Sequence, residues 1–300
     1  MTGIGHIVKP GRYGFTNPVS HRRDLVVPSK QGWTRAKNLP YSQQARGRSG
    51  GEFRLAVVAC CWQEESLVPF FLRHYWFADR LFIILGHSPD RSEELLRADP
   101  RVSISYLDMP EGLDDGKKRD AINNQMHQIQ DFDWALVVDI DEFLFPEGDP
   151  NGDTFKTKLA SVEPGANCIM ARMANVFRHK TDKDLDPALP GPVVYQRMHG
   201  NPAAITGNAK PCVVRTVPVP SFSVGQHNVT PRHFSEQVKI TGAHWQGADP
   251  SFSIHRVYDL RKQRLSPRNY RMNWGTGHYN ATPELLKIAY EAHSHDPLAI

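Results

Sequence analysis

Residues 134–145 read Trp-Ala-Leu-Val-Val-Asp-Ile-Asp-Glu-Phe-Leu-Phe, and this stretch decides the fold that we expect. Its apolar, β-branched run predicts a buried strand. The run leads into two carboxylates one residue apart, Asp139 and Asp141. Because alternate side chains of a strand share a face, both would project to the same solvent-facing side, roughly 6–7 Å apart along the chain. Two carboxylates placed so can address one bound cation. The alternative is a strand that simply meets solvent at its end.

The composition of the chain is ordinary for a globular protein. It has 300 residues, 40% of them hydrophobic and 23% charged, which suits one large α/β domain or two small ones. No stretch approaches about 18 uninterrupted apolar residues, and the N-terminal residues lack the apolar core of a signal peptide. We therefore expect a cytoplasmic protein without a membrane span. Because no cysteine pair has zinc-ligand or C-x-x-C spacing, we also expect free thiols at Cys60, Cys61, Cys168 and Cys212.

The N-terminal residues carry most of the excess positive charge. Residues 1–54 hold ten Lys and Arg against two acidic residues, so the rest of the chain has a net charge of −4 within the total of +4. This stretch is rich in Gly, Pro, Ser and Asn, which favours a flexible arm over residues 1–52 and a folded domain over 53–300. The arm could contact anionic lipid at the inner face of the membrane. A solvated extension is the alternative, and no nucleic-acid-binding motif accompanies it.

Predicted strands and helices alternate from residue 53 onward. We expect strands over 53–60, 81–85, 102–106 and 134–141, separated by helices over 65–79, 92–97 and 117–130. This alternation predicts a Rossmann-like α/β fold with a mostly parallel sheet flanked by helices, whose ligands bind beyond the carboxyl ends of the strands. The second half is less regular, with strands expected over 168–177, 211–217 and 252–257.

The order of these motifs resembles a family 2 type glycosyltransferase with the GT-A fold. Asp139-Ile140-Asp141-Glu142-Phe143-Leu144 is similar to the central motif of a bacterial subgroup that reads D-x-D-E-F-L. Other segments resemble, in order, the first-strand exit, the second-strand loop, the donor-side helix and weaker downstream landmarks of the family: Ala59–Glu65, Ser88–Ser92, Lys117–Asn123, Asn175–Phe177, Lys210–Arg215, Gly225–His227 and Ile254–His255. The resemblance covers roughly residues 55–260. It implies a nucleotide-sugar-binding half over 53–150 and an acceptor-side half over 151–300.

The resemblance implies a metal-dependent, inverting transfer of a sugar from a nucleotide-sugar donor to a saccharide, lipid-linked or other hydroxyl acceptor, as in polysaccharide biosynthesis. Mn²⁺ or Mg²⁺ would neutralise the leaving diphosphate. Asp141 would bind this cation directly, and Asp139 would bind the ribose or a metal-bound water. His255, and next His227, would supply an imidazole ligand.

The resemblance also implies the remaining contacts to donor and acceptor. Glu64 would hold the ribose or the base, while Lys118 or Arg119 would steady the diphosphate. Lys210 and Trp245 would contact the substrate, the tryptophan by stacking on a sugar ring. Either Glu236 or Asp249 would be the carboxylate base that deprotonates the acceptor hydroxyl.

Two positions depart from the family pattern. Gln63 stands where Asn is usual, and Gly86-His87 stands where Asp-Asn is common, at a place that the family often uses to read the base. The sequence therefore leaves the identity of the nucleotide-sugar donor undecided. A non-catalytic nucleotide-sugar-binding module is the first alternative function. A phosphatase of the haloacid-dehalogenase type is the second, although its D-x-D motif belongs on the earliest strand.

Overall fold

The computed structural model describes residues 26–29, 32–35, 52–201, 209–275, 280, 282–294 and 297–298. The chain divides into two units, residues 1–40 and 41–300. In the first unit, β1 (Val26–Ser29) and β2 (Gly32–Arg35) form an antiparallel hairpin. Apart from this hairpin and Glu52, the expected basic arm lies outside the described residues. No helix in the described part of the chain is both long and apolar enough to cross a membrane.

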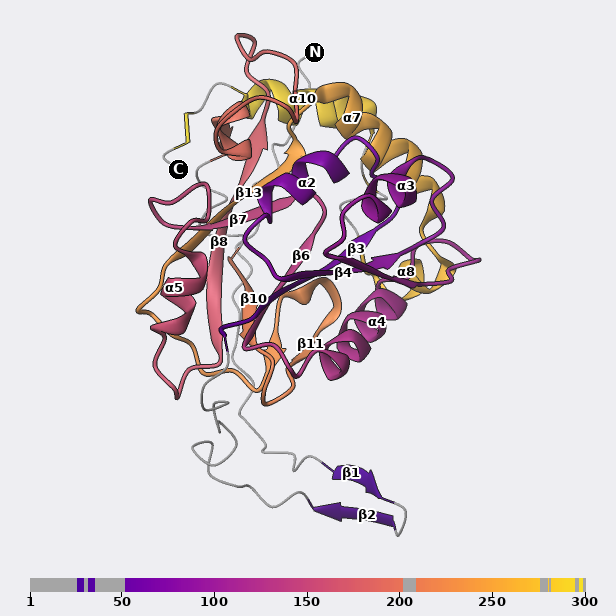
Figure 1. Cartoon of the computed structure of the whole chain (residues 1–300). Coiled ribbons are helices and arrows are strands. Elements are labelled where there is room, and N and C mark those ends of the chain that lie inside the picture. The colour runs from indigo at the N-terminus through magenta and orange to yellow at the C-terminus, as the bar shows by residue number, and fades with distance from the viewer. Residues whose placement is uncertain are drawn as a thin grey trace, which may run out of the picture. The chain divides into compact units, whose positions relative to one another are not determined.

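The second unit is built on one large sheet (Figure 1). Within the described residues, nine strands follow the order β5-β4-β3-β6-β10-β8-β13-β7, with β9 beside β8. The strands are β3 (Leu55–Cys61), β4 (Arg80–Leu85), β5 (Val102–Tyr106), β6 (Trp134–Asp139), β7 (Glu142–Pro146), β8 (Cys168–Phe177), β9 (His199–Asn201), β10 (Ala209–Arg215) and β13 (Ile240–Gly247). The first four strands of this order, and the β8–β13 pair, are parallel, whereas β10, β7 and β9 run antiparallel to their neighbours. The predicted α/β fold with a mostly parallel sheet is confirmed.

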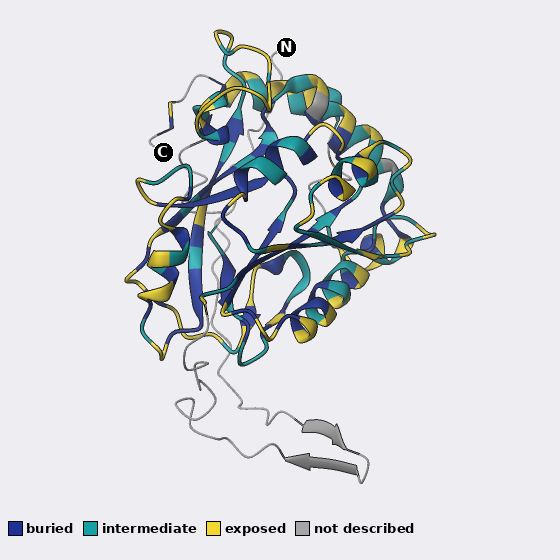
Figure 2. Cartoon of the chain, in the orientation of Figure 1, coloured by how far each residue is buried: buried dark blue, intermediate teal, exposed yellow. Residues whose placement is uncertain are grey.

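Helices cover both faces of this sheet (Figure 1). Side chains at Leu55, Val57 and Ala59 face one core, which contains residues of α2 (Val68–His74), α3 (Ser92–Arg97) and α5 (Phe155–Ala160). The intervening Ala56 and Val58 face a second core under α4 (Asp115–Gln128). Because β3 is buried on both faces, it reads as a continuous apolar run. Figure 2 shows this burial along the strands, with the exposed residues on the outer sides of the helices.

Short elements follow in the second half of the chain. They are η1 (Val193–Gln196), β11 (Ser221–Phe222), η2 (Val224–Gln226), β12 (Val229–Thr230), α7 (Pro250–Ile254), the π-helix η3 (His255–Arg261), η4 (Lys262–Arg264), α8 (Pro267–Met272) and α10 (Pro283–His293). The prediction of a strand over 252–257 is wrong, because this segment is helical. The Asp249 carboxylate accepts a hydrogen bond from the Ser251 backbone N–H (3.0 Å) and so favours a helix start over a strand.

The stretch 134–145 is also not one strand. Strand β6 ends at Asp139, the chain turns at residues 140–141, and β7 leaves in another direction to pair with β13. The Glu142 carboxylate accepts a hydrogen bond from the Asp139 backbone N–H (3.0 Å) and closes this turn. Asp139 and Asp141 are therefore not two residues of one strand face.

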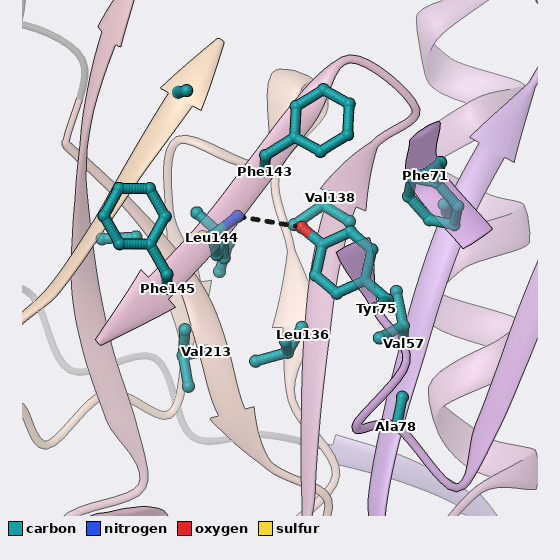
Figure 3. Packing of buried hydrophobic residues seen from close by; sticks show 14 of the residues in the cluster. Val57, Phe71, Tyr75, Ala78, Leu136, Val138, Phe143, Leu144, Phe145 and Val213 are labelled. Atoms are coloured by element: carbon teal, nitrogen blue, oxygen red, sulfur yellow. Dashed lines mark hydrogen bonds between the residues drawn. The ribbon is translucent and has the colours of Figure 1, made fainter. Parts of the chain in front are cut away.

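Strand β7 lies at the edge of the sheet, yet it is fully buried. Two consecutive side chains at the end of α2, His74 and Tyr75, take the place of a neighbouring strand, and Figure 3 shows the bond between Tyr75 and Leu144. The Tyr75 hydroxyl donates to the Glu142 carbonyl (2.6 Å) and accepts from the Leu144 N–H (3.1 Å). His74 Nε2 lies 2.8 Å from the Leu144 carbonyl, which can only accept, so this nitrogen carries the proton. These bonds satisfy backbone groups that would otherwise be buried without partners.

We expect Tyr75→Phe to lower the free energy of unfolding by about 1–3 kcal/mol, because it leaves buried backbone groups of β7 without their partner. Urea titration with an unchanged m-value measures this loss. Tyr195→Phe is the matched control, since Tyr195 is exposed, and it should change little. Equal effects of the two substitutions would show that the Tyr75 hydroxyl does not hold the edge strand.

Burial lowers the pKa of His74 to about 4. The unfolded chain then binds more protons than the folded one between pH 6.5 and 4, so this residue makes the protein less stable as the pH falls through that window. The wild type should lose on the order of 3 kcal/mol from this residue between pH 7 and 4. His74→Gln keeps a donor for Leu144 but does not titrate. The difference in unfolding free energy between the two proteins should therefore change with pH, and parallel curves would contradict the assignment.

Candidate active site

A cavity of about 530 Å³ lies at the carboxyl ends of β3 and β6. The order β5-β4-β3-β6 matches the 3-2-1-4 order of doubly wound sheets, and the strand order reverses between β3 and β6. Ligands of open α/β sheets bind at this switch point. The volume is within the range of small-molecule sites. Segments far apart in the sequence meet here, including residues 60–64, the start of α4, β13 and the η3–η4 segment.

Four of the predicted residues line this cavity and are held by ion pairs, namely Lys118, Asp139, Lys210 and Glu64. Lys118 Nζ contacts Asp139 Oδ1 at 2.5 Å, and Lys210 pairs with Glu142 behind the cavity wall. Burial alone would raise the pKa of Asp139, but Lys118 and Lys210 hold this pKa below its usual value. Burial alone would lower the pKa of Lys118, and Asp139 raises it. At neutral pH, Asp139 is therefore a carboxylate and Lys118 is a cation.

Asp141 does not face solvent as the sequence led us to expect. Its side chain is 1% exposed and accepts from Arg256, which also donates to Glu64 (Nε to Oε1, 2.8 Å). His244 Nε2 lies 3.0 Å from Asp141 Oδ2. Burial would raise the pKa of Asp141, but Arg256 and His244 keep it well below its usual value. The turn at residues 140–141 is the physical reason, since it directs Asp141 into the protein and away from Asp139.

Glu64 lines the cavity and is almost fully buried. Burial raises its pKa, although Arg256 and Arg261 oppose the shift. Its second oxygen, Oε2, is buried and has no hydrogen-bond partner in the described structure.

The side chains around Asp141 supply some of the ligands that a divalent cation needs. Among the described residues, no group of three or more His, Cys, Asp or Glu side chains is arranged to hold a metal ion. However, Asp141 Oδ1 is buried without a hydrogen-bond partner, and the His244 imidazole contacts the other oxygen of the same carboxylate. Magnesium sites commonly use one or two carboxylates together with substrate phosphates. Asp141 and His244 are thus the residues that would hold such a cation.

The remaining predicted residues lie at different places. His227 lines the cavity, where partial burial and, to a smaller extent, the charge of Lys210 lower its pKa. Asp141 is not among the residues that line the cavity, and neither are five others: Arg119, Glu236, Asp249, His255 and Trp245.

The surroundings of these five residues explain their separation from the cavity. Arg119 pairs with the adjacent Asp120 (2.6 Å), and Asp249 pairs with Arg178 (3.1 Å). The His255 side chain is 61% exposed and lies 3.4 Å from Asp259. Glu236 is also exposed. Trp245 is fully buried and packs against Phe70 and Phe143, with ring centroids 5.4 and 4.7 Å away.

Sequence reasoning missed His244, Arg256, Arg261 and Arg264. His244 stands next to Trp245, and the alternation of β13 buries one and turns the other toward the cavity. The arginines were missed because residues 252–257 were predicted as a strand. An R-x₄-R-x₂-R spacing over residues 256–264 was the available signal.

The departure at Gly86 has a steric reason. Gly86 and Trp62 both line the cavity, and a Cβ on Gly86 would lie 3.3 Å from Trp62 Cγ and 3.5 Å from Met109 Cε. A larger residue here would press on the indole ring. The glycine therefore makes room for an aromatic wall where the family resemblance implies an acidic residue. The second departure, Gln63, adopts a left-handed backbone (φ 56°), and its amide oxygen accepts from Arg264.

All four cysteines are free, as predicted from their spacing. Cys60 lines the cavity beside Lys118, and burial raises its pKa to about 12. It is therefore a neutral thiol at physiological pH rather than a nucleophile.

No protein-family model matches this chain, and no curated protein matches it. A solved structure described as a mycobacterial protein is 14% identical over 48% of this chain and 47% of its own, with a TM-score of 0.32. Glucosyl-3-phosphoglycerate synthase from Mycobacterium tuberculosis, crystallised with Mn²⁺, UDP and phosphoglyceric acid, is 15% identical over 40% of this chain and 43% of its own, with a TM-score of 0.29. The structure of 4-diphosphocytidyl-2C-methyl-D-erythritol synthase is 7% identical over 55% of this chain and 76% of its own, with a TM-score of 0.32. The chain spans less than half the length of the first two, and likenesses this weak carry no argument about its activity.

Arg256→Met should lower the free energy of unfolding by about 3–5 kcal/mol, because it leaves Asp141 and Glu64 as buried charges without their guanidinium. Asp141→Asn should then cost less in the Arg256→Met background than in the wild type, with a coupling of about 0.5–3 kcal/mol. A double-mutant cycle in urea measures this coupling. Arg91→Met is the control, because its pair with Glu94 is exposed, and it should leave stability unchanged. Additive effects at Asp141 and Arg256 would contradict the buried ion pair.

Proposed function

We propose that this chain is a glycosyltransferase that takes its sugar from a nucleotide-sugar donor. The observation that supports this proposal is the lining of the cavity at the sheet switch point. Trp62, Leu107 and Met109 offer apolar surface to a flat base, and the cationic side chains of Lys118, Lys210, Arg261 and Arg264 line the same space. Aromatic surface beside clustered cations is what a nucleoside diphosphate requires.

The charges around the cavity support a role for a divalent cation. Three carboxylates and four Lys or Arg side chains line it: Glu64, Asp115, Asp139, Lys118, Lys210, Arg261 and Arg264. Two further carboxylates, Asp141 and Glu142, and one further cation, Arg256, lie directly behind through their ion pairs. These formal charges sum to zero, so the site has no net positive charge to balance the negative charge of an incoming diphosphate. Bound Mn²⁺ or Mg²⁺ would stabilise the negative charge that grows on the leaving diphosphate.

The chain's own residues would position the donor for transfer. Lys118 holds Asp139 at the cavity edge, where the carboxylate can accept hydrogen bonds from ribose or sugar hydroxyls. Asp141 and His244 would hold the cation. The glycosidic bond to the diphosphate would break, with its electron pair leaving on the diphosphate, as a new bond forms to the acceptor oxygen, whose proton passes to a general base. We infer an inverting outcome only from the family resemblance.

The two halves of the domain would divide this work. Residues 53–150 would bind most of the donor, and residues 151–300 would supply Lys210, His244 and the acceptor side. A second cavity of about 310 Å³ adjoins the first, since Gln246 lines both, and it would bind the acceptor. Its lining includes Phe177, Tyr290 and Asn175, which suits a saccharide with hydroxyl groups and apolar faces.

Two other functions fit less well. A haloacid-dehalogenase-like phosphatase needs its nucleophilic aspartate on the first strand of the sheet, whereas β3 ends in Cys60-Cys61 and the D-x-D motif follows β6. A non-catalytic nucleotide-sugar-binding module shares the cavity and differs only in turnover, so the experiment must measure both binding and transfer.

We expect one of the UDP-, GDP-, dTDP- or CMP-sugars to raise the melting temperature, since a ligand that binds only the folded state stabilises it. The same donor should be hydrolysed or transferred only with Mn²⁺ or Mg²⁺ present. Asp141→Asn should lower this turnover by on the order of a thousandfold. Because Asp141 is buried, its variant must be shown to be folded under the assay conditions.

Two histidine variants provide the matched comparison. His244→Ala should weaken Mn²⁺ binding, measured by calorimetry, more than His255→Ala, because only His244 contacts Asp141 in the described structure. Chelator-insensitive turnover would rule out the cation mechanism. Donor binding without turnover across a wide acceptor panel would instead favour the binding module.

A further inference from the structure

The π-helix η3 and the η4 turn that follows it bring three arginines to one place. Arg256 is buried against Glu64 and Asp141, and Arg261 and Arg264 line the cavity. In an α-helix, residues five apart point about 140° away from each other. In a π-helix the repeat is i to i+5, so Arg256 and Arg261 lie one turn apart. Both guanidinium groups accordingly reach the same Glu64 oxygen, at 2.8 and 3.5 Å.

Arg261 and Arg264 differ from the other cations around the cavity in their partners. Lys118, Lys210 and Arg256 each contact a carboxylate closely. The ion pair of Arg261, at 3.5 Å, is with a carboxylate that Arg256 already binds at the shorter distance. Arg261 acts on Asp115 and Asp139 only through its charge. Arg264 donates to the neutral amide of Gln63. Within the described residues, these two guanidinium groups are the cavity-lining cations with the weakest ion pairing, and both are half-buried.

The backbone of Arg264 is held in place by the opposite rim of the cavity. The Leu113 N–H donates to the Arg264 carbonyl (2.5 Å), and the Ser266 N–H donates to the Leu113 carbonyl (2.9 Å). Gly112 makes this contact possible, because a Cβ there would lie 2.1 Å from the Arg264 oxygen. Gln63 then orients the side chain. A guanidinium fixed in this way loses little conformational entropy when it binds a ligand.

From this geometry we infer that Arg261 and Arg264 form a clamp that binds the diphosphate of the nucleotide donor and distinguishes it from a nucleoside. The inference rests on the proposed function and assigns the phosphate contacts to these two residues rather than to Arg119. Two forked donors on neighbouring helical turns match the several oxygens of a diphosphate. The clamp acts on binding, and it therefore operates with or without a bound divalent cation.

Calorimetry with UDP, GDP, uridine and guanosine tests this clamp, in EDTA and in Mn²⁺. Arg261→Gln and Arg264→Gln should each weaken binding of the preferred nucleoside diphosphate about tenfold or more, in both buffers. Binding of the corresponding nucleoside should not change, since the base wall is intact. The diphosphate affinities of Arg261→Lys and Arg264→Lys should lie between those of the wild type and the Gln variants, because lysine keeps the charge but not the paired N–H donors of a guanidinium. Lys262→Gln is the matched control on the same turn, where Lys262 lies over the Tyr258 ring (5.0 Å), and it should bind like the wild type.

Four results would overturn the inference. If both Arg→Gln variants bound the diphosphate as tightly as the wild type, neither arginine would contact it. Equal losses for nucleoside and nucleoside diphosphate would mean that the substitutions disturb the cavity rather than phosphate contacts. Diphosphate binding that requires Mn²⁺ and ignores the variants would assign the contact to the cation and leave the proposed function standing. A wild type that binds none of the nucleotides would contradict the proposed function itself, and the clamp with it.

Discussion

The site depends on one buried guanidinium. Arg256 is 2% exposed and joins Glu64, which follows β3, to Asp141, which follows β6. These two strand ends form the switch point at which the cavity opens, so one cation fixes the relative position of both walls. Taking three charged groups out of water is costly, and such a cluster persists only when its geometry is well satisfied. Removing any member would leave a buried charge beside the ligand-binding surface.

The same cluster sets the electrostatics of the cavity. Each acid of the D-I-D-E sequence has its own cationic partner: Lys118 for Asp139, Arg256 for Asp141 and Lys210 for Glu142. The pairing holds the pKa of both aspartates below the usual value despite burial, which alone would raise it. It also makes the wall close to neutral before a ligand arrives. Charge brought by a diphosphate must then be met by groups outside these pairs, which gives Arg261, Arg264 and a divalent cation their proposed roles.

The edge strand β7, which begins directly after Asp141, also fixes the position of this residue. His74 and Tyr75 satisfy the outer backbone groups of Glu142 and Leu144, while β13 pairs with the inner edge of β7 and places His244 opposite Glu142. An edge strand with these groups unpaired would be free to pair elsewhere. Helix α2, the edge strand and β13 therefore act together to bring His244 to Asp141.

The sequence by itself determined the parallel core, because β3, β4, β5 and β6 are local patterns of apolar residues separated by helical periodicity. It also placed Asp139 at the carboxyl end of a parallel strand, where ligands of such sheets bind. Glu64, Lys118 and Lys210, which also line the cavity, were implied by the family resemblance instead. The three-dimensional structure decided the rest. The turn after Asp139 buries Asp141, a side-chain cap makes residues 250–254 helical, and the π-helix brings Arg261 beside Arg256. None of these follows from hydrophobic periodicity. The turn and the cap use local polar contacts, Asp139 with Glu142 and Asp249 with Ser251. The burial of Asp141 depends on the distant Arg256, and the pattern does not encode a π-helix.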